Sequence, residues 1–156
     1  MKICVFSDSH GYAGNMIAAI ELEDPDLCFF LGEGERDIVK VGERFPDLPI
    51  YAVRGNCDFR SNLSGSLSCA IGGVTLFATH GHMSNVKYES RLDTLTEQAR
   101  RAGASVALFG HTHSQHLSEN RGVTLVNPGP AGRGYYPGYA VLTIENGICS
   151  AELKAI

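Results

Sequence analysis

The feature that most restricts the fold of this sequence is the alternation of short apolar runs with helical segments in its first third. Apolar runs at 2–7, 26–32 and 49–55 predict buried β-strands, because runs of this length bounded by polar residues are typical of strands. Between them, 15–23 and 36–45 carry apolar residues at helical spacing. Strand, helix, strand, helix, strand predicts a parallel sheet whose connections are crossover helices.

The remaining two thirds of the chain predicts β-hairpins around one further helix and one further strand. We expect hairpins at 66–81, 116–129 and 139–156, with turns at Gly72-Gly73, Asn120–Gly122 and Asn146-Gly147. The segment 88–102 predicts a helix that Gly103 ends, and 105–110 predicts a strand. A parallel half followed by an antiparallel half indicates two sheets packed together with helices outside.

Composition limits the class of protein. A length of 156 residues predicts one domain spanning 1–156, and a net charge of −4 argues against general nucleic-acid binding. The five cysteines form no CxxC pair; Cys4, Cys28 and Cys149 lie in apolar runs, which predicts buried free thiols and a cytoplasmic location. Because the sequence shows no leader peptide and no apolar run near about 18 residues, we expect no membrane contact.

Polar side chains that can bind metal follow five of the predicted strands. They are Asp8, His10, Glu33, Asn56, Asp58, His80, His82, His111 and His113. Ligands of open α/β sheets bind at the carboxyl ends of strands. The i, i+2 spacing of a pair such as His111 and His113 lets both side chains lie on one side of an extended chain. One such motif alone is consistent with a helix cap or a turn, but five together indicate a site.

The ligand types narrow the chemistry of this predicted site. Carboxylate, imidazole and amide oxygen without thiolate suit manganese, iron, zinc, nickel or cobalt rather than a structural zinc. The set is too large for one ion. Two ions about 3.5–4 Å apart would form a hydrolytic centre that holds both the attacking and the leaving oxygen of a displacement.

The ordered motifs DSH at 8–10, GE at 32–33, GNCD at 55–58, THGH at 79–82 and GHTH at 110–113 resemble those of the calcineurin-like metallophosphoesterase superfamily. With NPGP at 127–130, the chain is most similar to the small phosphodiesterases of the YfcE and MJ0936 type. The resemblance implies an α/β fold, a four-layer αββα sandwich of two mixed β-sheets flanked by helices.

The resemblance also implies roles for the motif residues. One metal would be held by Asp8, His10 and His113, the second by Asn56, His80 and His111, and Glu33 would bridge both with a hydroxide that attacks phosphorus. Besides Asn56, we expect Asp58 and His82 to take part in catalysis, Asp58 by orienting a ligand or solvent and His82 by contacting phosphate or orienting its neighbours. Arg54 is expected either to neutralise phosphate or to form a structural ion pair. Two divalent ions are implied, with manganese expected first and nickel, cobalt, iron or zinc as alternatives.

Two positions depart from the family pattern. Many members carry a histidine after the motif asparagine, where this chain has Cys57. Glu33 stands where the family has a bridging aspartate, and its extra methylene group predicts two metal sites of unequal affinity.

These features predict a phosphodiesterase that acts on a small or extended phosphate ester. Two alternatives stay open. One is a protein-interaction scaffold on the same fold, as in a retromer subunit, and the other is a phosphomonoesterase with the same motifs. The sequence does not determine the oligomeric state, and a homo-oligomer is possible.

Overall fold

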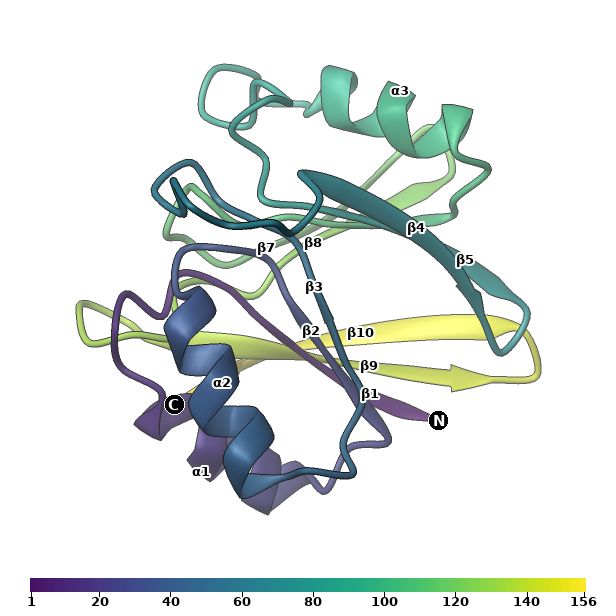
Figure 1. The fold of residues 1–156 in the computed structure, drawn as a ribbon. Coiled ribbons are helices and arrows are strands. Elements are labelled where there is room, and N and C mark those ends of the chain that lie inside the picture. The colour runs from purple at the N-terminus through teal and green to yellow at the C-terminus, as the bar shows by residue number, and fades with distance from the viewer.

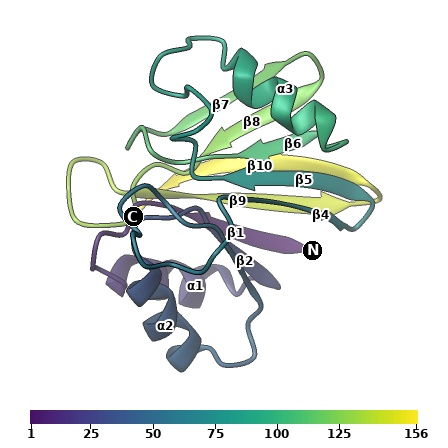
Figure 2. The ribbon, with the colours of Figure 1, turned by 45° about the horizontal axis from the view of Figure 1, so that its top comes forward.

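Two five-stranded β-sheets pack face to face, and helices cover their outer faces, as Figure 1 shows in the computed structural model, which describes residues 1–156. The layers follow the order helix, sheet, sheet, helix, and Figure 2 shows them from a second direction. This is the expected αββα sandwich, and the fold prediction is confirmed. None of its helices has the length and apolar character needed to cross a membrane.

The first sheet has the strand order β10-β9-β1-β2-β3. Its parallel strands are β1 (Lys2–Phe6), β2 (Leu27–Phe30) and β3 (Ile50–Ala52). The crossover helices α1 (Gly14–Glu23) and α2 (Glu35–Arg44) cover its outer face. A C-terminal hairpin of β9 (Gly138–Glu145) and β10 (Ile148–Ala155) adds to β1 in antiparallel fashion, so the sheet is mixed.

The second sheet has the strand order β4-β5-β6-β8-β7. Its three inner strands are parallel: β5 (Val74–Thr79), β6 (Val106–Leu108) and β8 (Val123–Asn127). The edge strands β4 (Ser66–Ile71) and β7 (His116–Asn120) are antiparallel to their neighbours. Helix α3 (Asp93–Arg101) covers the outer face.

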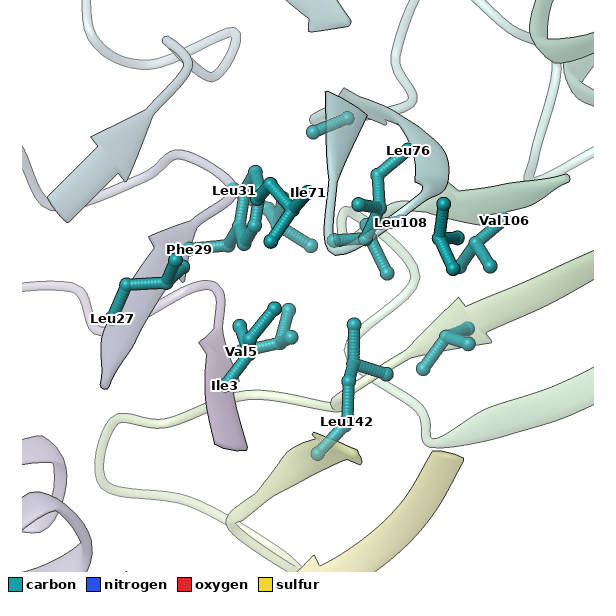
Figure 3. Packing of buried hydrophobic residues seen from close by; sticks show 14 of the residues in the cluster. Ile3, Val5, Leu27, Phe29, Leu31, Ile71, Leu76, Val106, Leu108 and Leu142 are labelled. Carbon is teal, nitrogen blue, oxygen red and sulfur yellow. The ribbon is translucent and has the colours of Figure 1, made fainter. Parts of the chain in front are cut away.

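The largest hydrophobic cluster lies between the two sheets and contains 16 buried residues. Figure 3 shows members of this cluster from both sheets, among them Val5 and Phe29 of the first sheet and Leu76 and Leu108 of the second. Two smaller clusters lie under the helices, one beneath α1 and α2 and one beneath α3. Burial of this kind stabilises by about 25 cal/mol per Å² of apolar surface, so the central cluster holds the strands, and therefore their ends, in fixed positions.

Two local predictions are wrong. The third helix begins at Asp93 rather than at residue 88. Leu92 adopts a left-handed conformation with φ 55°, which interrupts the helix before Asp93. In addition, Glu89 accepts hydrogen bonds from the backbone N–H and the hydroxyl of Thr94. Cys149 is only partly buried, because it lies on the edge strand β10, whereas Cys4 and Cys28 are buried as expected. All five cysteines are free thiols.

Candidate metal centre

The loops that follow β1, β2, β3, β5 and β6 meet at one edge of the sandwich. Backbone hydrogen bonds join them, including Asp8 N–H to the Gly32 carbonyl at 2.9 Å and Gly110 N–H to the His80 carbonyl at 3.0 Å. Glycine permits the close approach, because a Cβ on Gly32 would lie 2.6 Å from the Gly55 nitrogen and a Cβ on Gly110 would overlap Ser7 Oγ. The strand-end side chains are therefore brought into one cluster.

Three side chains form the tightest part of this cluster. The ligand atoms of Asp8, His10 and His113 all lie within 4.8 Å of one another. The Nε2 atoms of His10 and His113 are 3.3 Å apart. Both imidazoles are about half exposed, whereas Asp8 is buried. The group is open to solvent on the side of the two histidines.

The two oxygens of Asp8 differ in their surroundings. Oδ2 accepts hydrogen bonds from Ser7 Oγ and, at 3.1 Å, from the backbone N–H of His111. Oδ1 is buried and accepts no hydrogen bond. The Nε2 atoms of His113, His10 and His80 nevertheless lie 3.1, 3.8 and 4.0 Å from it. A buried carboxylate oxygen is costly without a compensating group, so a cation shared with these imidazoles fits the position.

His80 and His111 form the second part of the cluster. Nε2 of His80 lies 3.2 Å from Nδ1 of His111. Because Nδ1 of His80 lies 2.7 Å from the Leu31 carbonyl, it donates there and leaves the Nε2 lone pair facing the cluster. Burial, with smaller contributions from His80 and Lys87, lowers the pKa of His111 to about 4. His80 thus presents a ring nitrogen to the cluster, and the lowered pKa of His111 favours the neutral form that binds metal.

Glu33 is buried and lies at the border of this second part. Its Oε1 is 3.6 Å from Nε2 of His80 and accepts a 2.6 Å hydrogen bond from the backbone N–H of Cys57. Its side chain lies directly over Gly55, where a Cβ would overlap Oε1. The carboxylate of Glu33 also raises the pKa of the Cys57 thiol. The loop after β3 therefore holds the Glu33 side chain in place.

Asn56 and His82 lie farther from the cluster centre. Asn56 is exposed, and its amide donates to Cys57 Sγ at 3.4 Å. The ring of His82 packs beside His80 and His111 at centroid distances of 5.6 and 6.2 Å. Its Nδ1 is buried without a hydrogen-bond partner, and burial lowers its pKa. His82 thus places an unsatisfied ring nitrogen at the edge of the site.

Asp58 connects the loops rather than facing the cluster. Its Oδ2 accepts hydrogen bonds from the backbone N–H groups of Glu33 at 2.8 Å and Gly55 at 2.7 Å, and its Oδ1 accepts from Gly34 at 3.2 Å. Burial alone would raise the pKa of Asp58, but these N–H groups outweigh it and hold the pKa below its ordinary value. The carboxylate fixes the backbone that carries Glu33.

Two further residues hold the loops, and the sequence reasoning assigned them no role. Asp37 is buried and accepts hydrogen bonds from Ser9 Oγ at 2.7 Å and Gly11 N–H at 2.8 Å. Asn127, in the NPGP segment, donates to the Gly110 carbonyl and to Thr112 Oγ1, both at 3.0 Å. The position of Asn127 at the end of a strand was the one available signal. Nothing local marks Asp37, because its partners lie on the loop after β1.

The backbone of the cluster is unusual. Five of the proposed ligands have positive φ angles: Asp8 at 54°, His10 at 45°, Glu33 at 66°, His111 at 67° and His113 at 53°. Side chains with a Cβ disfavour this left-handed region by about 1–2 kcal/mol. Strain of this kind concentrates at functional sites, where the surrounding structure enforces it.

Carboxylate and imidazole ligands at the strand ends of a two-sheet αββα sandwich define the class of metal-binding phosphoesterases. The chain belongs to the calcineurin-like phosphoesterase superfamily, whose domain matches residues 1–147. The family predicted from the motifs is confirmed. Membership supports hydrolysis of phosphate esters and the binding of divalent metal ions.

Similar proteins agree with this assignment. The chain is 34% identical to the probable metallophosphoesterase YsnB of Bacillus subtilis, over 94% of this chain and 86% of that protein. It is 28% identical to phosphodiesterase MJ0936 of Methanocaldococcus jannaschii, over 99% of this chain and 95% of that protein. Vps29 of Entamoeba histolytica in complex with zinc shares the fold, with a TM-score of 0.76, 18% identity, and coverage of 100% of this chain and 98% of that chain.

Proposed function

We propose that the protein is a phosphodiesterase that depends on two divalent metal ions. The observation that carries this proposal is Oδ1 of Asp8, which is buried, accepts no hydrogen bond and faces three imidazole nitrogens. The phosphodiesterase name of the relative MJ0936 supports a diester as substrate. We further propose that residues 1–156 work as one domain in the cytoplasm, in agreement with five free cysteines.

The residues would divide between two ions. Asp8, His10 and His113 would hold the first, Asn56, His80 and His111 the second, and Glu33 would lie between them. When bound, such ions polarise a phosphoryl group and lower the pKa of a water molecule. Oxygen and imidazole ligands suit manganese, which we propose as the native metal, with nickel, cobalt, iron and zinc as the alternatives.

The remaining polar groups would act on the substrate or on the ligands. The unsatisfied Nδ1 of His82 lies beside His80 and can reorient toward a phosphate oxygen. Asp58 is a positioning residue, because it fixes the backbone of Glu33 without facing the cluster. Arg54 makes no ion pair, so its charge is available to neutralise phosphate.

One observation favours the alternative of a scaffold with little activity. Oε1 of Glu33, which is proposed to lie between the two ions, accepts a hydrogen bond from the Cys57 N–H group, so one oxygen of this carboxylate already has another partner. A poorly occupied second site would slow hydrolysis. The shared fold of Vps29 shows only that the architecture is the same.

The test is metal content measured together with hydrolysis of bis-p-nitrophenyl phosphate. We expect close to two equivalents of manganese and turnover that a chelator abolishes. Asp8→Asn removes the central charge at nearly constant shape and should lower kcat at least tenfold, with loss of bound metal. Asp47→Asn is the matched control, because Asp47 is exposed and lies before β3, at the opposite ends of the strands. If the fully metallated protein turns over no phosphate ester, the scaffold function replaces this one.

A further inference from the structure

Some of the Lys and Arg side chains of this protein have a bonding partner in the structure and others have none. Seven of the thirteen Lys and Arg side chains make an ion pair or hydrogen bond. The other six make neither: Arg36, Arg54, Arg60, Lys87, Arg91 and Arg133. In a chain with a net charge of −4, these are the charges available to an anionic ligand.

Most of these free cations lie around the candidate metal centre. Lys87 lines a groove described below, and Arg54 directly precedes Gly55, over which the Glu33 side chain lies. Arg133 lies over the Tyr12 ring at 4.3 Å and follows Gly132, whose N–H donates to the Asp8 carbonyl. Arg36 and Arg60 line a hollow beside the centre, described below.

A first groove of about 480 Å³ borders the centre on the side of the second sheet. Its walls include Lys87 and Tyr88 on one side and Thr112 and Gln115 on the other. Thr112 lies between His111 and His113 in the chain, so the groove adjoins the loop that carries these two proposed ligands. The carboxylate of Glu89, which also lines it, is engaged by the backbone and hydroxyl of Thr94.

A second groove of about 620 Å³ borders the centre on the side of the first sheet. Gly11 follows His10 and Gly34 follows Glu33, so this groove also begins at the proposed ligands. Arg36, Phe59 and Arg60 line its outer part. Both grooves have volumes typical of ligand sites.

Three carboxylates also line the second groove, and two of them already have partners. Asp37 accepts hydrogen bonds from the loop after β1 and pairs with Lys40, and Asp58 accepts from three backbone N–H groups. Glu35 is the remaining carboxylate and makes no side-chain hydrogen bond or ion pair. Arg36 and Arg60 are therefore the two unpaired cations of this groove, and Glu35 is its one unpaired carboxylate.

Each groove also presents an exposed aromatic ring. Tyr88 of the first groove is 87% exposed and Phe59 of the second is 90% exposed. An aromatic ring beside an unpaired cation is the combination that binds single-stranded nucleic acid, because bases stack on the ring and phosphates meet the charge.

We propose that the substrate is a short single-stranded oligonucleotide, with the scissile phosphodiester at the metal centre and the flanking nucleotides in the two grooves. This inference rests on the proposed phosphodiesterase function. A diester has two arms, which two grooves can accommodate, whereas a monoester has only one. A duplex is disfavoured, because a protein with a net charge of −4 offers no broad cationic surface.

The reaction needs only water as second reactant. The oxygen of water forms a bond to phosphorus, and the bond between phosphorus and one ester oxygen breaks. One product keeps the phosphate as a monoester, and the other leaves as an alcohol that has taken up a proton from water. No oxidation or reduction takes place.

The first experiment compares hexathymidylate with bis-p-nitrophenyl phosphate as substrates of the manganese-loaded protein. In single strands, log K falls with log salt by about 0.7 for each phosphate contact. In the wild type, kcat/KM for hexathymidylate should fall as salt is raised from 50 to 200 mM. The double variant Arg36→Ala/Arg60→Ala removes two phosphate contacts, so its fall over the same salt range should be about sevenfold smaller. Arg44→Ala is the matched control on the same helix, because Arg44 pairs with Glu21. Glu35→Gln should act in the opposite direction and raise kcat/KM.

The second experiment tests the aromatic rings. Phe59→Leu and Tyr88→Leu keep apolar volume but remove the stacking surface, and each should lower the ratio of kcat/KM for hexathymidylate to that for the aryl phosphate about fivefold or more. Hydrolysis of the aryl phosphate without cleavage of hexathymidylate overturns the inference and leaves the proposed function intact. An unchanged salt dependence in the double arginine variant also overturns it. A protein that hydrolyses neither substrate contradicts the phosphodiesterase function itself.

Discussion

Replacing His113 with glycine should stabilise the metal-free protein relative to replacing it with alanine. His113 has φ 53°, and its side chain is 51% exposed, so either substitution opens no cavity in the core. Alanine keeps the left-handed strain of about 1–2 kcal/mol, whereas glycine relieves it. Glycine also raises the entropy of the unfolded chain, which costs about 0.4–1 kcal/mol. The net gain in the free energy of unfolding is about 0.5–1 kcal/mol, or a rise of about 1–4 °C in Tm.

The assay is thermal unfolding in the presence of a chelator, with manganese added in parallel. Both variants lack an imidazole ligand, so both should lose most of the metal-induced rise in Tm shown by the wild type. Ser118 in the edge strand β7 provides the matched control, because it is exposed and its φ is negative. There Ser118→Gly should melt below Ser118→Ala. A metal-free His113→Gly protein that melts no higher than His113→Ala would refute the idea that the ligand loops store backbone strain.

Three further predictions concern the ligands and one buried ion pair. His111→Ala and His113→Ala should each lower phosphodiesterase activity at least tenfold with loss of bound metal, while the chelated proteins melt close to the chelated wild type; a far lower melting temperature would reveal a structural role. Glu33→Asp should raise metal occupancy and activity at limiting metal, whereas Glu33→Gln should lower both in parallel titrations. Glu23 accepts 2.8 Å hydrogen bonds from Lys154 and from Tyr139. The hydrogen bond from Lys154 is the main reason why the pKa of Glu23 is lowered, and burial of the carboxyl group acts in the opposite direction. Because the folded pKa is below the ordinary value of about 4.3, this stabilisation is present above that pH and is lost as pH falls through the folded pKa. Glu23→Gln should thus destabilise by about 1–3 kcal/mol at pH 7 and little at low pH, as measured by denaturant unfolding.

Most of the strands could be predicted because their signals are local. Residues 3–6 and 27–31 are apolar throughout, as strands buried on both faces are, and a small or polar residue follows each run. The glycine and asparagine turns of the hairpins are equally local. The grouping of the strand-end side chains then follows from a general rule, that the carboxyl ends of parallel strands share one edge of a sheet.

Other features depend on contacts that no local pattern reveals. The start of α3 is set by Leu92 and by the Glu89 side chain, whereas helical spacing extends the pattern back to 88. The role of Asp37 depends on a loop 26 residues earlier in the chain. The unpaired state of Oδ1 in Asp8 is a property of the assembled cluster. Sequence can therefore nominate the ligand set, but the geometry around each ligand comes from tertiary contacts.

The geometry around Glu33 accounts for a glutamate where the family has aspartate. An extra methylene group moves a carboxylate outward by about one C–C bond, or about 1.5 Å. In this protein the longer side chain lies over Gly55, which has no Cβ to obstruct it, and its Oε1 accepts the Cys57 N–H hydrogen bond. Asp58 holds the Glu33 and Gly55 backbones together and so maintains this arrangement. The loop after β3 therefore holds the longer side chain. Because the carboxylate is anchored on that side and lies 3.6 Å from His80, it would contribute less to an ion on the Asp8 side. We therefore expect the two proposed metal positions to differ in affinity.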